Sequence, residues 1–108
     1  MKSKTYTTSA NIPNATRKAV YRRDGFMCAV CGDPRSLQIH HAVHRSRGGS
    51  NDPQNLITLC WRCHALAHGT RLPDMPDYMD VDWMEQTIVE YLSDYYAENQ
   101  GKPWSPLE

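Results

Sequence analysis

Four cysteines occur as two Cys-x-x-Cys pairs, and their spacing is typical of a metal site. The first pair is Cys28 with Cys31, and the second is Cys60 with Cys63. Each pair spans one tight turn, so two turns can offer four thiolates at tetrahedral angles, the shell that zinc prefers. Because four sulfurs fill this shell, we expect a structural rather than a catalytic zinc. Two disulfides are the alternative, and the lack of a recognisable secretory segment disfavours them.

All five histidines lie between residues 40 and 68, which indicates a second reactive group. His64 and His68 are four positions apart, so on a helix both imidazoles share one face and can converge on one metal ion. His40 and His41 are adjacent, so on a strand their side chains point to opposite faces and should do different work. An imidazole that is neutral at physiological pH can bind a metal or accept a proton.

The elements that must position these residues are short. Residues 13–24 have the signals of a helix, with Pro13 at its start and Gly25 after its end, and Val20 with Tyr21 facing inward. Its basic residues, which we expect to remain solvated, are Arg17, Lys18, Arg22 and Arg23. Alternating apolar residues predict a strand over 37–43, a second strand follows over 55–59, and residues 45–53 have a loop composition.

Two helices follow the second strand. Residues 60–69 are helical in character, with a stop at Gly69. After a linker over 71–78, Asp80 or Asp82 can cap a final helix that reaches about residue 98. Apolar residues at helical spacing predict its core-facing side. They are Val81, Met84, Ile88, Tyr91 or Leu92, and Tyr95.

Charge is divided sharply along the chain, although the formal net charge is 0. Residues 1–73 hold 11 Lys and Arg against 3 Asp and Glu, a formal +8, whereas residues 74–108 hold 1 against 9, a formal −8. The basic part could therefore bind a polyanion. We expect the acidic part to balance this charge on the far side of the domain, with autoinhibition or a basic partner as alternatives.

The stretch around the cysteines resembles the HNH nuclease family, a branch of the ββα-metal (His-Me) endonucleases. The matching motifs are Cys-x-x-Cys-Gly, Leu-x-x-His-His, Gly-Gly, Asn-Leu-x-x-Leu-Cys-x-x-Cys-His and a final His. They cover roughly residues 16–69, about half of the chain. The three letters of the family name correspond to His41, Asn55 and His64.

The resemblance implies an α+β fold, a small ββα-metal (HNH) domain with a structural four-cysteine zinc site, flanked by an N-terminal and a C-terminal helix. We expect a flexible arm at 1–12, the nuclease domain at 13–73, and an acidic helix and tail at 74–108 packed on the same domain.

The resemblance also implies roles for the polar residues. His41 would be the general base, and Asn55 would tie the loop that holds it. The colicin-type members imply that His40, His64 and His68 hold one divalent ion, Mg²⁺, Mn²⁺, Ni²⁺ or Zn²⁺. Three imidazoles suit a transition metal better than Mg²⁺. We assign solvent or phosphate contact to His44. The residues expected to contact phosphate or DNA are Arg45, Arg47 and Arg62.

The function implied is a metal-dependent DNA endonuclease, a hydrolase that nicks DNA or cleaves it with weak specificity. A catalytically inactive zinc module that binds nucleic acid or protein is the first alternative, and an RNA-cleaving or toxin-like nuclease is the second. Small HNH proteins are common in bacteriophages, so a phage packaging or other targeting protein is an expected partner. We expect a location in the bacterial host cytoplasm and no membrane association. Both a monomer and a homodimer are compatible with the sequence.

Overall fold

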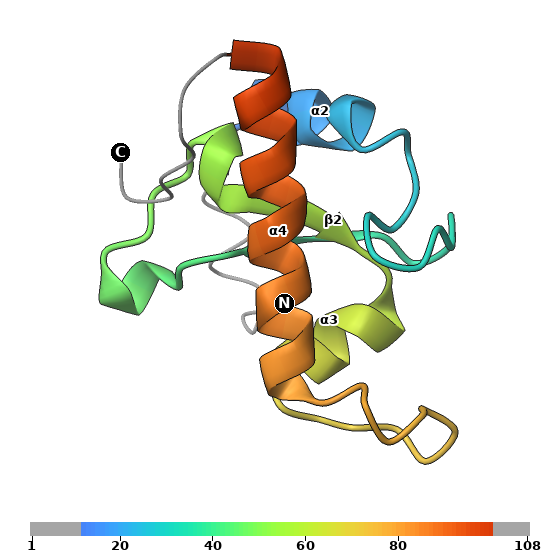
Figure 1. Cartoon of the computed structure of the whole chain (residues 1–108). Helices are drawn as coiled ribbons and strands as arrows, with labels where there is room; N and C mark the ends of the chain where they lie inside the picture. The colour runs from blue at the N-terminus through green and yellow to red at the C-terminus, as the bar shows by residue number, and fades with distance from the viewer. Residues whose placement is uncertain (1–11, 101–108) are drawn as a thin grey trace, which may run out of the picture.

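The computed structural model of the chain describes residues 12–100 (Figure 1). In order, it contains helix α2 (Asn14–Arg23), strand β1 (Gln38–His41), the 3-10 turns η2 (Arg45–Arg47) and η3 (Pro53–Asn55), strand β2 (Leu56–Leu59), helix α3 (Trp61–Ala67) and helix α4 (Val81–Gln100). A two-stranded sheet flanked by helices confirms the predicted α+β class. Most of the expected N-terminal arm, and the tail after residue 100, lie outside the described residues.

The two strands are antiparallel and shorter than predicted. Gln38 pairs with Leu59 at one end, and His41 pairs with Leu56 at the other. Residues 42 and 43 leave the strand because the side chain of Asn55 binds both backbone groups of Val43. All four residues of β2 are buried, since the sheet is covered on both faces.

The two faces of the sheet belong to two hydrophobic clusters. On one face, Ile39 and Leu56 pack with Val20 of α2. On the other, Ile57 and Leu59 pack with residues of α3 and α4. His40 pairs with Ile57 and His41 with Leu56, so the alternation of the strand directs the two histidines to different sides of the domain.

Helix α4 crosses the molecule from α3 to α2 and covers the second cluster (Figure 1). It starts after Asp80, whose Oδ1 accepts a hydrogen bond from the backbone N of Trp83 at 2.8 Å and so caps the helix as predicted. Its buried residues are Met84, Ile88, Leu92 and Tyr96. The predicted stripe is correct in its centre and wrong at its start, and at its end Tyr95 packs against the core but is only partly buried. Val81 is 43% exposed, and Tyr96 rather than Tyr95 is buried.

Two residues near α2 differ from the sequence prediction. Ile12, assigned to the flexible arm, is buried in a cluster with Val20, Ile39 and Leu56, because removing its apolar side chain from water is favourable. Arg23, predicted to be solvated, has a side chain only 6% exposed and forms an ion pair with the buried Asp24. A run of basic residues on a helix gave no sign that its last member turns inward.

Candidate metal centres and catalytic site

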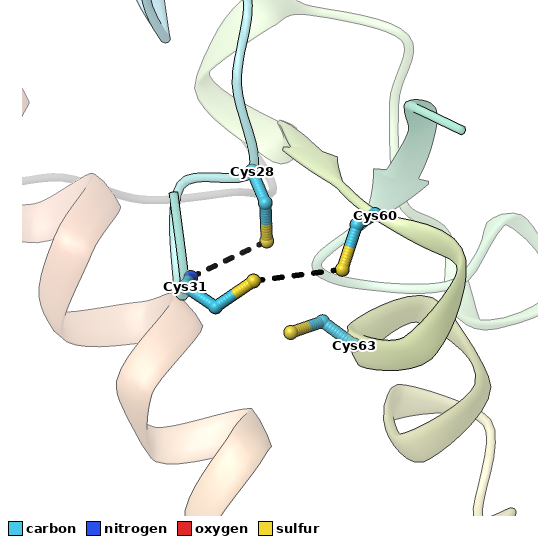
Figure 2. A group of neighbouring side chains, drawn as sticks. All are labelled: Cys28, Cys31, Cys60 and Cys63. Carbon is cyan, nitrogen blue, oxygen red and sulfur yellow. Dashed lines mark hydrogen bonds between the residues drawn. The ribbon is translucent and has the colours of Figure 1, made fainter. Parts of the chain in front are cut away.

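The four cysteines converge at the junction of the loop after α2 and the start of α3 (Figure 2). Their sulfur atoms all lie within 4.8 Å of one another, and Cys31 Sγ is 3.6 Å from Cys60 Sγ. A tetrahedral zinc with Zn–S bonds of about 2.3 Å separates its sulfurs by roughly 3.8 Å. Gly32, at φ +83°, allows the turn that returns the first pair toward the second. The donor set and its geometry therefore fit a four-thiolate zinc site.

The electrostatics of these sulfurs also fit a bound cation. The hydrogen bond from Cys63 lowers the pKa of Cys28 to about 4, and burial raises the pKa of Cys31 to about 11. The pKa of Cys63 is raised too, mainly by its hydrogen bond to Cys28. Four sulfurs this close share protons because four neighbouring thiolates repel one another. A divalent cation removes that repulsion and allows all four to ionise.

A second group of possible metal ligands joins β1 to α3. His40 lies on the strand, and His64 and His68 lie one helical turn apart at the end of α3. The ring centroids are 5.3 Å apart for His40 and His64, 5.1 Å for His40 and His68, and 4.6 Å for His64 and His68. The Nε2 atoms of His64 and His68 are 3.1 Å apart. One nitrogen of each ring lies within 4.8 Å of the others, a set that could hold one metal ion.

These three imidazoles are neutral near pH 7. Burial is the main cause in each case, and the neighbouring histidines add to it. The pKa of His40 falls to about 2 and that of His64 to about 4, while that of His68 is lowered as well. A neutral imidazole offers a lone pair to a metal, so their protonation state is the one that coordination requires. Three such ligands leave positions open on the ion for water or phosphate.

His41 is buried but separate from this group. Its Nε2 lies 2.8 Å from Oδ1 of Asn51, a residue ten positions further along the chain. His41 is nevertheless close enough to His40 for its charge to contribute to the lowered pKa of His40. The structure therefore places a histidine that could act as a base next to three that could bind metal. Asn51 was missed in the sequence because an Asn in a polar loop carries no distinguishing signal.

Asn55 is fully buried and ties together the two ends of the loop between the strands. Its Oδ1 accepts a hydrogen bond from Val43 N at 2.7 Å, and its Nδ2 donates to Val43 O at 3.0 Å and to Ser50 O at 2.8 Å. Gly49 fits against this arrangement only because it lacks a side chain. A Cβ at that position would lie 1.7 Å from Val43 O and 2.8 Å from Asn55 Nδ2.

The three arginines expected at phosphate differ in position. Arg47 is exposed on η2, within the loop whose two ends Asn55 ties at Val43 and Ser50. Arg62 forms an ion pair with Asp74, with Nη2 3.0 Å from Oδ2, and it interacts with the thiolates of Cys60 and Cys63. Because positions 62 and 64 do not share a helix face, Arg62 lies beside the cysteines and away from the histidines. The side chain of Arg45 is outside the described part of the structure.

The sequence led us to expect the acidic helix on the far side of the domain from the histidines. The structure instead places part of α4 beside them. A cavity of about 40 Å³ is lined by His40 and His44 and also by Glu85 of α4. The remaining lining residues are Ala42, Ala67, Val81, Ile88 and Val89. The ring of exposed His44 is 5.7 Å from that of His40 and 5.6 Å from that of His68. A negative charge therefore lies beside the histidine cluster.

Comparisons with known proteins match the part of the chain that contains this site. The family model described as HNH endonuclease matches residues 28–70, which include both groups of possible ligands, His41 and Asn55. A curated protein named Anaredoxin, from Nostoc sp. (strain PCC 7120), is 40% identical over 53 residues, which are 48% of this chain and 70% of that protein. No solved structure gives a significant match. The chain belongs to the HNH endonuclease family.

Within residues 12–100, no helix combines the length and the apolar character that crossing a bilayer requires.

Proposed function

We propose that this protein is a metal-dependent DNA endonuclease that hydrolyses phosphodiester bonds, by nicking or by weakly specific cleavage. One observation carries the proposal. Three neutral histidines converge as a possible ligand set, while the adjacent His41 points to the other face of β1 and is hydrogen-bonded to Asn51. A set of metal ligands and a separate general base are the two components that phosphodiester hydrolysis by this family requires.

In this mechanism, His41 accepts a proton from the water that attacks phosphorus. A divalent ion at His40, His64 and His68 would stabilise negative charge on the phosphoryl oxygens and on the leaving 3′ oxygen. The all-nitrogen donor set favours Ni²⁺, Zn²⁺ or Mn²⁺ over Mg²⁺. Asn55 keeps the loop of the base in place, as its bonds to Val43 and Ser50 suggest.

DNA is the proposed substrate because the segment that contains the site is strongly basic. Residues 1–73 carry a formal +8, and Arg47 is exposed within the loop between the two strands. Arg62 is a weaker candidate for phosphate contact, since Asp74 already neutralises its charge. Targeting by a phage packaging protein or another partner, and action in the bacterial cytoplasm, belong to the same proposal.

A supercoiled-plasmid cleavage assay tests this function. The zinc-loaded protein is stripped of weakly bound metal, and Mg²⁺, Mn²⁺, Ni²⁺ and Zn²⁺ are added back separately. We expect cleavage that depends on the added ion and disappears in His41→Ala. Gln38→Ala, on the same strand, is the matched control and should remain active. If folded wild-type protein with its full zinc content cuts neither DNA nor RNA with any ion, the inactive binding module replaces the enzyme as the best interpretation.

A further inference from the structure

We infer that Asn51 is the positioning residue of the proposed base, and that it holds His41 in the tautomer that carries its proton on Nε2. This inference rests on the proposed nuclease function and deepens it. Neither the family match nor the sequence motifs assign a role to Asn51. The structural basis is the 2.8 Å contact between His41 Nε2 and Asn51 Oδ1.

The chemistry of the two groups fixes the direction of this hydrogen bond. An amide oxygen can only accept, so the ring nitrogen that faces it must carry the hydrogen. A neutral imidazole has one N–H and one lone pair, and its lone pair is then on Nδ1. Asn51 therefore selects which nitrogen of His41 can receive a proton. It also limits rotation of the ring about its Cβ–Cγ bond.

The loop shows how Asn51 is itself held in place. Asn55 Nδ2 donates to the backbone oxygen of Ser50 at 2.8 Å, and Ser50 immediately precedes Asn51. The same Asn55 side chain binds both backbone groups of Val43, two residues after His41. Asn55 thus fixes the backbone at both ends of the loop, and Asn51 completes the link by a side-chain contact to the ring.

This arrangement predicts what Asn51 does during proton transfer. A proton passes from water to Nδ1 of His41, which leaves hydroxide for attack on phosphorus and converts the ring to an imidazolium. The Nε2 proton stays in place and continues to bind Asn51 Oδ1. A hydrogen bond from a charged donor is stronger than one from a neutral donor, so the contact stabilises the ring more after the transfer than before it.

Three variants separate this role from a general effect on the loop. Asn51→Leu removes the acceptor with little change in volume, and Asn51→Asp keeps an acceptor oxygen in the same position. Ser50→Ala is the matched control, because it alters the same loop while leaving the Ser50 backbone oxygen for Asn55. The zinc content and the melting temperature of each variant establish that it is folded.

The decisive measurement is the tautomer of His41, read from long-range ¹⁵N–¹H NMR spectra of the zinc-loaded protein at a pH where the ring is neutral. Comparison with His41→Ala assigns the signal, and no catalytic ion or substrate is needed. We expect a proton on Nε2 in wild type, Ser50→Ala and Asn51→Asp, and a mixture of tautomers in Asn51→Leu. A proton on Nδ1 in wild type, or an unchanged tautomer in Asn51→Leu, would overturn the inference.

Kinetics then test the consequence for catalysis. Changes in groups that orient a reactive residue commonly cost roughly 10- to 100-fold. We expect Asn51→Leu to lower kcat by such a factor with KM little changed, Asn51→Asp to recover much of the loss, and Ser50→Ala to resemble wild type. An equal kcat for wild type and a folded Asn51→Leu would contradict the positioning role. An inactive wild type with the expected tautomers would instead refute the nuclease function and leave the assigned contact intact.

Discussion

Arg23 and Asp24, neighbours at the end of α2, form a buried ion pair joined by two hydrogen bonds of 2.7 and 2.9 Å. The guanidinium of Arg23 also donates to Pro53 O and Leu56 O, the backbone oxygens on either side of Asn55. The carboxylate of Asp24 accepts from Thr58 N in β2 and from the hydroxyl of Tyr91 in α4. One pair of side chains therefore connects α2, the second strand and α4 behind the proposed catalytic loop.

Arg23→Leu should destabilise the protein strongly, because it leaves the carboxylate of Asp24 buried without its cation. Breaking a buried ion pair in this way typically costs about 3–5 kcal/mol. Urea unfolding of the zinc-loaded protein measures the change. Arg22→Leu is the control, since Arg22 is exposed, and it should change the free energy of unfolding by less than about 0.5 kcal/mol. Similar losses in both variants would show that the buried pair has no special role.

Cys63→Ser should abolish tight zinc binding and unfold the region around the start of α3. The four sulfurs are the only donors proposed for this ion, and zinc binding contributes directly to folding in small domains. Zinc content, by elemental analysis of the dialysed protein, and far-UV circular dichroism measure the effect. Met27→Ser is the control, because Met27 precedes the first cysteine and is exposed. Iron in place of zinc in the purified wild type would contradict the assignment of the metal.

When no ion is bound at the histidine cluster, the free energy of unfolding of the protein should be lower in acid than at pH 7. His40 and His64 have pKa values of about 2 and about 4 in the folded state, below the ordinary value of 6.5. As the pH falls below 6.5, the unfolded chain binds protons that the folded chain does not, so the free energy of unfolding decreases. For His64 this decrease continues to about pH 4.

Unfolding curves between pH 7 and pH 4 measure this dependence. Zinc release from the cysteines acts in the same direction, so the comparison must be made with His64→Gln, which keeps the cysteine site and removes one titrating group. We expect a smaller loss of stability over this interval in His64→Gln than in wild type. Equal losses would mean that His64 is not held neutral by burial in the fold.

Glu85→Gln should strengthen binding to DNA. Glu85 lines the cavity beside His40 and His44, where its charge opposes a phosphate. Fluorescence anisotropy with a short duplex, at low ionic strength and without a catalytic ion, should show an affinity a few-fold higher than wild type. The difference should shrink as salt screens the charge. Glu90→Gln removes a charge from another face of α4 and should have a smaller effect. An equal gain in both variants would show that only net charge matters.

Local spacing was enough to predict much of this site. Two Cys-x-x-Cys pairs predicted a group of four sulfurs, and the structure brings them within reach of one ion. Positions 64 and 68 predicted a shared helix face, and the adjacent His40 and His41 predicted side chains with different neighbours. These predictions succeeded because the periods of helix and strand fix the relative directions of nearby side chains, whatever the rest of the fold does.

Contacts between distant segments were decided by the tertiary structure alone. The burial of Arg23 depends on Asp24, on the carbonyl groups around Asn55 and on Tyr96 of α4. The contact between Asn51 and His41 depends on the path of a ten-residue loop. The position of Glu85 beside the histidines depends on how α4 packs across the sheet. The sequence by itself determined which side chains could bind metal and which faces they share, and packing between elements decided what surrounds them, because no local period encodes those distances.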